Sequence, residues 1–272
     1  MSTDARPSAL KLHTVGVSMP PSKETQTALR YSGMSRYKLT REGLLDGSLR
    51  AASQAMLGAA STRYMSDEDR ARQIAQVLAC APASDAIWVF GYGSLMWNPA
   101  FHFAERKTAR IHGYHRQFCL WARAGRGSPE RPGLMLGIEP GGSCNGVIYR
   151  IAPGLVKSEL DVLWRREMNS AAYRPEWVVA RTREGLVHAL TVAVNRAHER
   201  YIGDLDLIST ARYLAQGAGP LGLCCDYLFE TVAHLRELGV RDRLLELLET
   251  HVRVHCAPGE PTARGAGERS CA

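Results

Sequence analysis

The chain has 272 residues, of which 45% are hydrophobic and 22% are charged, proportions that are typical of a globular protein. No run of about 18 apolar residues occurs in the sequence, which excludes a membrane-spanning helix. The formal net charge of +7 comes from scattered arginines rather than from a basic tail, so we expect no nucleic-acid partner. Since the first residues show no basic stretch followed by an apolar one, we expect no secretory signal and a cytoplasmic protein without a membrane partner.

The cysteine and histidine patterns bear on disulfides and metals. The seven cysteines are odd in number and include no CxxC pair, so neither a disulfide framework nor a zinc finger is indicated. His112 and His115 form an HxxH pattern, but no second ligand pair accompanies it. We therefore expect no metal and no cofactor. The sequence predicts no particular oligomeric state.

The first 85 residues divide into two segments. Residues 1–35 mix Ser, Thr, Pro and Met without a helical or strand period, which predicts a flexible extension. Residues 36–85 predict a helical lead-in, with a short helix near 40–45 and a linker or weak helix over 51–65. A clearer helix starts at Ser66, where Ser-Asp-Glu-Asp predicts a capping box, and it ends before Pro82.

Residues 86–252 predict the main domain, and residues 253–272 predict a disordered tail. The expected elements are strands over 87–90, within 110–121, over 134–138 and over 147–151, a helix over 155–168, a hairpin of strands over 177–181 and 186–194, and helices over about 205–215, 223–238 and 241–252. Strands that come first and helices that come later favour an α+β fold. We expect a mixed or antiparallel sheet that curls into a small barrel.

The first chemical feature is the turn Gly91-Tyr92-Gly93-Ser94-Leu95 after the first buried strand. Two glycines let the backbone turn tightly and let a ligand approach closely. Successive N–H groups in such a turn form a site for an anion or a carbonyl oxygen. Dinucleotide, phosphate-loop and hydrolase-elbow motifs do not match these residues. From the residues alone, a purely structural turn and a binding loop both remain open.

The second feature is Glu167. Leu163 and Trp164 lie four and three residues earlier, and Leu160 lies seven earlier, so all three share a helix face with Glu167. A carboxylate that points into a core costs several kcal/mol unless it is paired. This placement makes Glu167 a candidate general acid/base.

An alternative for Glu167 is a half-exposed helix end, with the carboxylate paired to Arg174 or another arginine. The adjacent Arg165 and Arg166 are expected to point in other directions around the helix. The residues alone do not choose between these two interpretations.

Together these residues form a familiar pattern. The segment 88–97 resembles the opening of the ChaC family, which belongs to the γ-glutamylcyclotransferase-like superfamily, and Tyr-Gly-Ser-Leu stands intact at 92–95. The family's catalytic glutamate, in an Arg-Glu context before a Tyr-Arg pair, falls on Glu167. Further agreement comes from segments 113–118, 126–133, 219–222 and 226–228. Residues 169–172 depart from the family, since many relatives carry glycines there.

The resemblance implies a small closed or nearly closed β-barrel surrounded by helices, and an enzyme that converts glutathione into 5-oxoproline and L-cysteinylglycine. Glu167 would then be the general acid/base. The substrate-binding residues that the resemblance implies are Val89, Phe90, Gly91, Tyr92, Gly93, Ser94, Leu95 and Tyr227.

Several roles remain open beside that assignment. Tyr227 either bonds the glutamyl group or packs a helix on the core, and Arg116 is expected in a surface salt bridge rather than on a substrate carboxylate. Ser94 is interpreted as a turn or binding residue because no His/Asp pair presents itself. The rival functions are a cyclotransferase for other γ-glutamyl amino acids or amines, and a non-catalytic regulatory protein on the same fold.

Overall fold

The structure is a computed structural model that describes residues 38–57, 64–83 and 86–256. All of these residues belong to the compact unit Ser35–Ala272. The expected extension over 1–35, and the expected tail from residue 257 onward, lie outside the described residues. Within the described ranges, no helix has both the length and the apolar character needed to cross a bilayer.

Five strands close into a barrel, which confirms the predicted mixed barrel. They are β1 (Ile87–Gly91), β2 (Glu105–Ala122), β3 (Gly133–Ile151), β4 (Tyr173–Arg181) and β5 (Leu186–Val194), in the order β1-β3-β2-β4-β5. Most neighbours are antiparallel, whereas β1 and β5 pair in parallel where Val89 meets Leu190. Closure leaves the sheet without long open edges.

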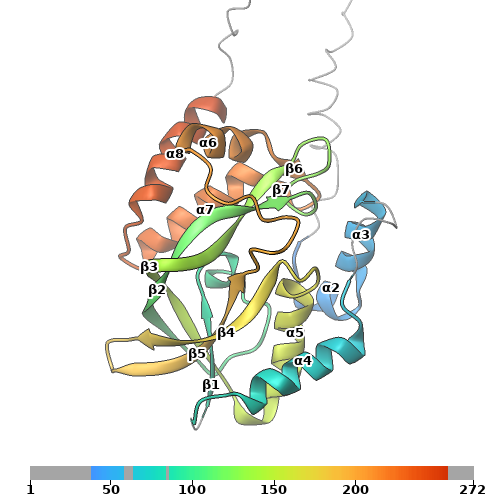
Figure 1. Cartoon of the computed structure of the whole chain (residues 1–272), viewed down its shortest axis with the longest axis vertical. Coiled ribbons are helices and arrows are strands. Elements are labelled where there is room, and N and C mark those ends of the chain that lie inside the picture. The colour runs from blue at the N-terminus through green and yellow to red at the C-terminus, as the bar shows by residue number, and fades with distance from the viewer. Residues whose placement is uncertain (1–37, 58–63, 84–85, 257–272) are drawn as a thin grey trace, which may run out of the picture. The chain divides into compact units, whose positions relative to one another are not determined.

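The strand β3 differs from the prediction, which placed two strands on either side of a turn at 140–142. The structure has one continuous strand that stays paired with β2 along its length. Gly141 and Gly142 have φ angles of 105° and 67°, and Gly113 on the opposite strand has a φ of 84° beside a register shift. Glycine tolerates these angles, so the ribbon bends here without breaking. Figure 1 shows β2 and β3 side by side as long green strands.

The lead-in forms three helices, α2 (Arg41–Leu45), α3 (Ser48–Leu57) and α4 (Asp67–Ala79). The start of α4 is as predicted, because the Ser66 hydroxyl accepts a hydrogen bond from the Asp69 N–H at 3.0 Å. The sequence left linker and weak helix open for residues 51–65, and the structure forms a helix as far as Leu57. The helix α5 (Val156–Glu167) follows a 3₁₀ turn, η2 (Pro153–Leu155).

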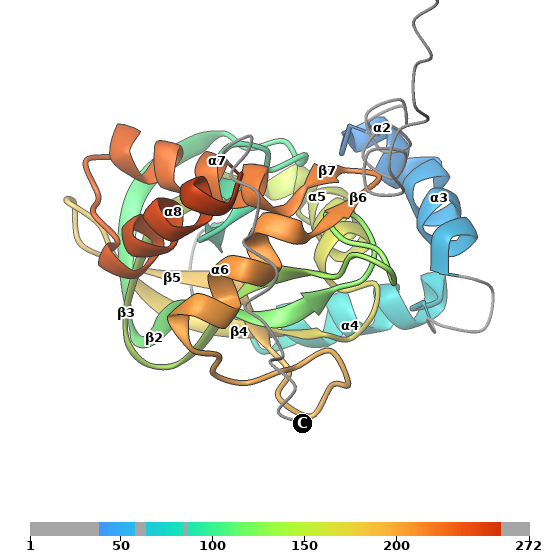
Figure 2. The ribbon, with the colours of Figure 1, turned by 90° about the horizontal axis from the view of Figure 1, so that it is seen from above.

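The last three helices, α6 (Leu207–Gln216), α7 (Cys224–Glu237) and α8 (Arg243–Cys256), pack against one another. Figures 1 and 2 show them grouped on the barrel away from α4. A small hairpin, β6 (Ala218–Gly219) and β7 (Gly222–Leu223), occupies the expected linker between α6 and α7. The helix α8 continues to Cys256, four residues beyond the predicted helix end at 252.

The buried face of α5 contains Leu160, Leu163 and Trp164, which is the stripe expected from their spacing. Each such side chain contributes about 1.5–3 kcal/mol when it is fully buried. Polar contacts then tie α5 to the lead-in: Arg41 Nη2 donates to Glu159 Oε1 at 2.9 Å, and Arg70 pairs with Asp161. These contacts fix the helix whose last residue is Glu167.

Candidate active site

The glycine turn begins where β1 ends at Gly91 and leads into a short 3₁₀ helix, η1 (Ser94–Met96). A Cβ on Gly91 would lie 2.7 Å from the Leu95 Cβ, and one on Gly93 would lie 2.7 Å from the Tyr227 hydroxyl. A side chain at Gly91 would therefore force the turn itself to shift, and one at Gly93 would displace the Tyr227 hydroxyl. The Tyr92 hydroxyl donates to the Val192 carbonyl at 2.9 Å and anchors the turn to β5.

The turn presents backbone donors. The N–H of Met96 donates to the Gly93 carbonyl at 2.8 Å, and that of Asn98 to the Ser94 carbonyl at 2.9 Å. Within the part of the chain that the structure describes, the N–H groups of Gly93, Ser94 and Leu95 donate to no other residue. Successive free N–H groups of this kind suit a carboxylate or a developing oxyanion.

Glu167 ends α5 beside this turn. Its side chain is only 12% exposed, and its Oε1 accepts a hydrogen bond from Arg166 Nε at 2.7 Å. The other oxygen, Oε2, accepts from no described residue. This arrangement leaves one carboxylate oxygen held and the other available for proton transfer.

Arg166 joins α5 to the turn. Its Nη2 donates to the Ser94 hydroxyl at 2.6 Å, and its Nη1 donates to the Asn98 carbonyl. The expectation that Arg166 points away from Glu167 is therefore wrong. Its side chain is 3% exposed, and its guanidinium donates to three acceptors at the helix end. The alternative of an arginine-paired glutamate at the helix end is therefore met in part, since Glu167 pairs with Arg166 but is largely buried. Arg174 is not its partner and pairs with Glu176 at 2.6 Å.

Three buried phenols lie within electrostatic range of the Glu167 carboxylate. Burial raises the pKa of Tyr92, Tyr173 and Tyr227, and the charge of Glu167 raises each pKa further. The phenols are therefore neutral donors near pH 7. Tyr92 and Tyr173 donate to carbonyls, the latter to Leu136 at 2.6 Å. The Tyr227 hydroxyl donates to no described residue and lies against Gly93, so it is available to a ligand.

The remaining predicted site residues lie in the core. Val89 and Phe90 have buried side chains on β1, and Leu95 is buried as well. The Phe90 carbonyl accepts a hydrogen bond from the Thr191 hydroxyl at 3.0 Å. These three side chains are thus buried in the core, whereas the Ser94 hydroxyl accepts a hydrogen bond from Arg166.

Arg116 differs from the expected surface salt bridge. It is buried, and its Nη1 donates to Asp242 Oδ2 at 2.8 Å, while its Nε has no hydrogen-bond partner among the described residues. Its Nη2 donates to the Asn145 carbonyl. Since β2 carries Arg116 and Asp242 precedes α8, this ion pair fastens the last helix to the barrel.

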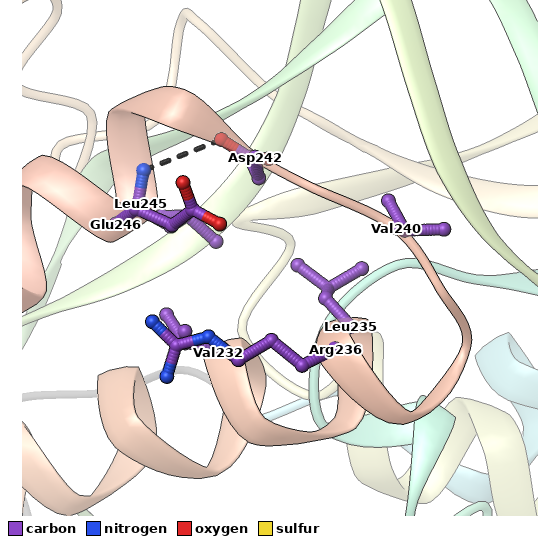
Figure 3. Close-up of a pocket in the computed structure, with 7 residues that line it drawn as sticks. All are labelled: Val232, Leu235, Arg236, Val240, Asp242, Leu245 and Glu246. Atoms are coloured by element: carbon purple, nitrogen blue, oxygen red, sulfur yellow. Dashed lines mark hydrogen bonds between the residues drawn. The ribbon is translucent and has the colours of Figure 1, made fainter.

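Two hollows lie away from these residues. Figure 3 shows the one between α7 and α8, where the Leu245 N–H donates to Asp242 Oδ1 at 3.3 Å. The second, on the outside of the barrel, includes His112 and Arg181. None of the predicted site residues lines either hollow. Among the described residues, no cluster of three or more His, Cys, Asp or Glu side chains is placed to hold a metal.

The sequence shows similarity to proteins of one family. A family model described as ChaC-like protein matches residues 87–255. The chain is 37% identical to the Escherichia coli (strain K12) protein named glutathione-specific gamma-glutamylcyclotransferase, over 82% of this chain and 96% of that protein. It is 30% identical to gamma-glutamylcyclotransferase 2-3 of Arabidopsis thaliana, over 62% of this chain and 89% of that protein.

A crystal structure of a glutathione-specific γ-glutamylcyclotransferase from yeast has the same fold. It superposes with a TM-score of 0.59 at 23% sequence identity, covering 63% of this chain and 97% of the yeast chain. The α-helical lead-in before residue 87 lies outside the segment that the family model matches.

Proposed function

Since the chain belongs to the ChaC-like family, we propose that it is a glutathione-specific γ-glutamylcyclotransferase, a lyase that releases 5-oxoproline and L-cysteinylglycine from glutathione. The observation that carries the proposal is the placement of Glu167. Its carboxylate is largely buried, one oxygen is free, and Arg166 ties it to the turn at 92–95. A carboxylate and a set of N–H donors are thus held on adjacent segments.

The substrate supplies its own nucleophile. The glutamyl α-amine attacks the γ-carbonyl carbon and closes a five-membered lactam, and the bond from that carbon to the cysteinyl nitrogen breaks. Two protons leave the attacking nitrogen, and two arrive on the departing one. Glu167 accepts and returns these protons, which is general acid/base catalysis worth about 10²–10⁴ in rate. The chemistry requires no cofactor or metal.

The turn and Tyr227 complete the site. The N–H groups of Gly93, Ser94 and Leu95 are suited to stabilise the oxyanion of the tetrahedral intermediate, and the loss of one such donor costs about 100-fold or more. The neutral Tyr227 phenol donates to the glutamyl group. The site holds the γ-glutamyl chain folded so that its amine and its carbonyl meet, and this proximity accelerates the reaction.

Glutathione is the proposed partner, and neither nucleic acid nor membrane enters the reaction. A cytoplasmic location stays part of the proposal. The regulatory alternative has less support, because a binding protein needs no carboxylate that is largely buried beside free N–H donors.

The test is incubation of the purified full chain with glutathione and, separately, with γ-glutamyl-alanine, with 5-oxoproline measured by liquid chromatography and mass spectrometry. We expect 5-oxoproline from glutathione and at least tenfold less from γ-glutamyl-alanine. Equal release would indicate a general γ-glutamyl cyclotransferase. The absence of product from both would contradict the enzyme assignment and favour the non-catalytic alternative.

A further inference from the structure

Arg200 is a half-buried arginine that lies beyond the catalytic helix. It belongs to the turn that follows β5, and its Nε donates to the Trp121 carbonyl at 2.7 Å. Its Nη1 donates to the Ser170 hydroxyl at 3.2 Å, and its Nη2 contacts the Met135 sulfur at 3.5 Å. All of these partners are neutral. No described carboxylate forms an ion pair with Arg200, so its charge is held in place without being neutralised.

A second arginine increases the positive charge. Arg123 is exposed just after β2 ends at Ala122, and it forms neither a hydrogen bond nor an ion pair with any described residue. The Trp121 N–H donates to the Arg200 carbonyl at 2.8 Å, so Arg200 pairs with the chain two residues before Arg123. Burial lowers the pKa of Arg200, the charge of Arg123 lowers it as well, and the charge of Glu199 acts in the opposite direction. The two positive charges repel each other, and neither guanidinium forms an ion pair with a described carboxylate. An anion that binds both would relieve that repulsion and form charge-assisted, bidentate hydrogen bonds.

This arginine pair lies near the candidate active site. Ser170, which Arg200 contacts, is three residues beyond Glu167 in the chain. Burial raises the pKa of the Tyr173 phenol, the charge of Glu167 raises it further, and the charge of Arg200 lowers it. Arg200 and Glu167 are therefore within electrostatic range of the same buried phenol.

The position of Arg200 and Arg123 suits the cysteinylglycine end of the substrate rather than its reacting γ-glutamyl end. The amine and γ-carbonyl must lie at Glu167 and at the turn, where Arg166 is already satisfied by three acceptors. The cysteinylglycine part extends about 7 Å from the γ-carbonyl to its carboxylate, if two extended residues are counted. This part distinguishes glutathione from other γ-glutamyl compounds.

We propose that Arg200 and Arg123 bind the glycyl carboxylate of glutathione and thereby determine the preference for glutathione. The proposal rests on the proposed function, because it assumes that the γ-glutamyl end occupies the site at Glu167. In this proposal the glycyl carboxylate contact distinguishes glutathione from γ-glutamyl amino acids and amines, because their shorter ends do not reach Arg200 and Arg123.

The experiment compares glutathione with its monoethyl ester, in which the glycyl carboxylate is blocked and the rest is unchanged. We expect the wild-type kcat/KM to be about 10- to 100-fold lower for the ester, as the loss of a charge-assisted pair predicts. Arg200→Gln and Arg123→Gln should lower kcat/KM for glutathione and leave that for the ester nearly unchanged. Arg200→Lys, which keeps the charge but loses the fork, should recover part of the preference.

The comparison of glutathione with its ester distinguishes a substrate-binding role of Arg200 from a structural one. A structural role for Arg200 would lower kcat/KM for both substrates in the same proportion, and so would binding of the glutamyl α-carboxylate. Either result, or a wild-type enzyme that does not distinguish the ester, overturns the proposal. Arg123 is exposed and forms no hydrogen bond or ion pair with a described residue, so its variant provides the test even where Arg200→Gln unfolds.

Isothermal titration calorimetry separates this proposal from the proposed function. Tighter binding of glutathione than of its ester to the wild-type chain, with the preference reduced in Arg123→Gln, supports the carboxylate site even if no 5-oxoproline forms. In that outcome the catalytic assignment fails alone. Equal affinity for the two compounds, together with turnover of both, would overturn the carboxylate site and leave the catalytic assignment standing.

Discussion

Replacement of Glu167 by glutamine tests the carboxylate with little change in shape. The glutamine oxygen can still accept the hydrogen bond that Arg166 Nε now donates to Oε1 at 2.7 Å. A hydrogen bond to a charged group contributes about 1.5–3 kcal/mol and a neutral one about 1 kcal/mol, so the free energy of unfolding should fall by only about 0.5–2 kcal/mol. For a domain of this size the melting temperature should fall by a few degrees, at about 2–4 °C per kcal/mol.

The effect on activity should be far larger. An amide cannot accept the amine proton, so kcat for 5-oxoproline release from glutathione should fall by about 10²–10⁴. Rates should be measured at saturating glutathione, alongside the melting temperature and glutathione affinity of the same preparations. Glu167→Asp keeps a carboxylate on a shorter side chain, and we expect it to retain more activity than the glutamine variant.

Glu176→Gln is the matched control. Glu176 also pairs with an arginine, Arg174, at 2.6 Å, but it lies on β4 rather than at the turn. We expect its kcat to equal that of the wild type within about twofold. If Glu167→Gln keeps more than a tenth of the wild-type kcat while folded, the acid/base assignment is wrong.

Further predictions concern the turn, the phenol and the lead-in. Gly93→Ala places a Cβ 2.7 Å from the Tyr227 hydroxyl, so the melting temperature should fall and kcat/KM should fall at least tenfold. The melting temperature should recover when Tyr227→Phe removes the clashing atom, and no recovery would argue against this contact. Tyr227→Phe alone should lower kcat/KM about tenfold with little loss of stability, since its hydroxyl donates to no described residue; unchanged kinetics would exclude it from substrate binding. Burial opposes ionisation of Glu159, but hydrogen bonds from Arg41 and from the His102 N–H outweigh burial and lower the pKa of Glu159. The ionised carboxylate therefore stabilises the fold above about pH 4.5, and this stabilisation is lost as pH falls through the folded-state pKa. Thermal melts from pH 3 to 7 should therefore show a weaker acid dependence in Glu159→Gln, and equal slopes would refute the linkage.

Local patterns in the sequence predicted most of the elements. The spacing of Leu160, Leu163 and Trp164 predicted the buried face of α5, and Ser66 predicted the start of α4. The pattern failed at 140–142, where glycines usually end a strand. In the barrel they bend β3 instead, because β2 supplies backbone partners on both sides of the bend.

The site was predicted in part. The sequence named the turn and Glu167 as candidates, and in the structure Arg166 links the two. Their roles in binding and catalysis stay predictions. Arg166 was missed because a basic residue in the last turn of a helix is ordinarily explained by the helix dipole and by solvent. Its true acceptors, Ser94 and Asn98, are 72 and 68 residues away in the chain. No local period carries that information.

The sequence by itself determined the helices, most of the strands, the glycine turn and the family, because these depend on residue spacing and on steric limits within a few residues. Only the tertiary structure decided which side chains meet. Barrel closure and the packing of α5 and α7 bring Arg166, Glu167 and Tyr227 to the turn, and leave Arg200 and Arg123 without an acidic partner among the described residues. Such encounters follow from the packing of segments that are distant in the chain, where burial and charge balance, rather than local propensity, select the partner.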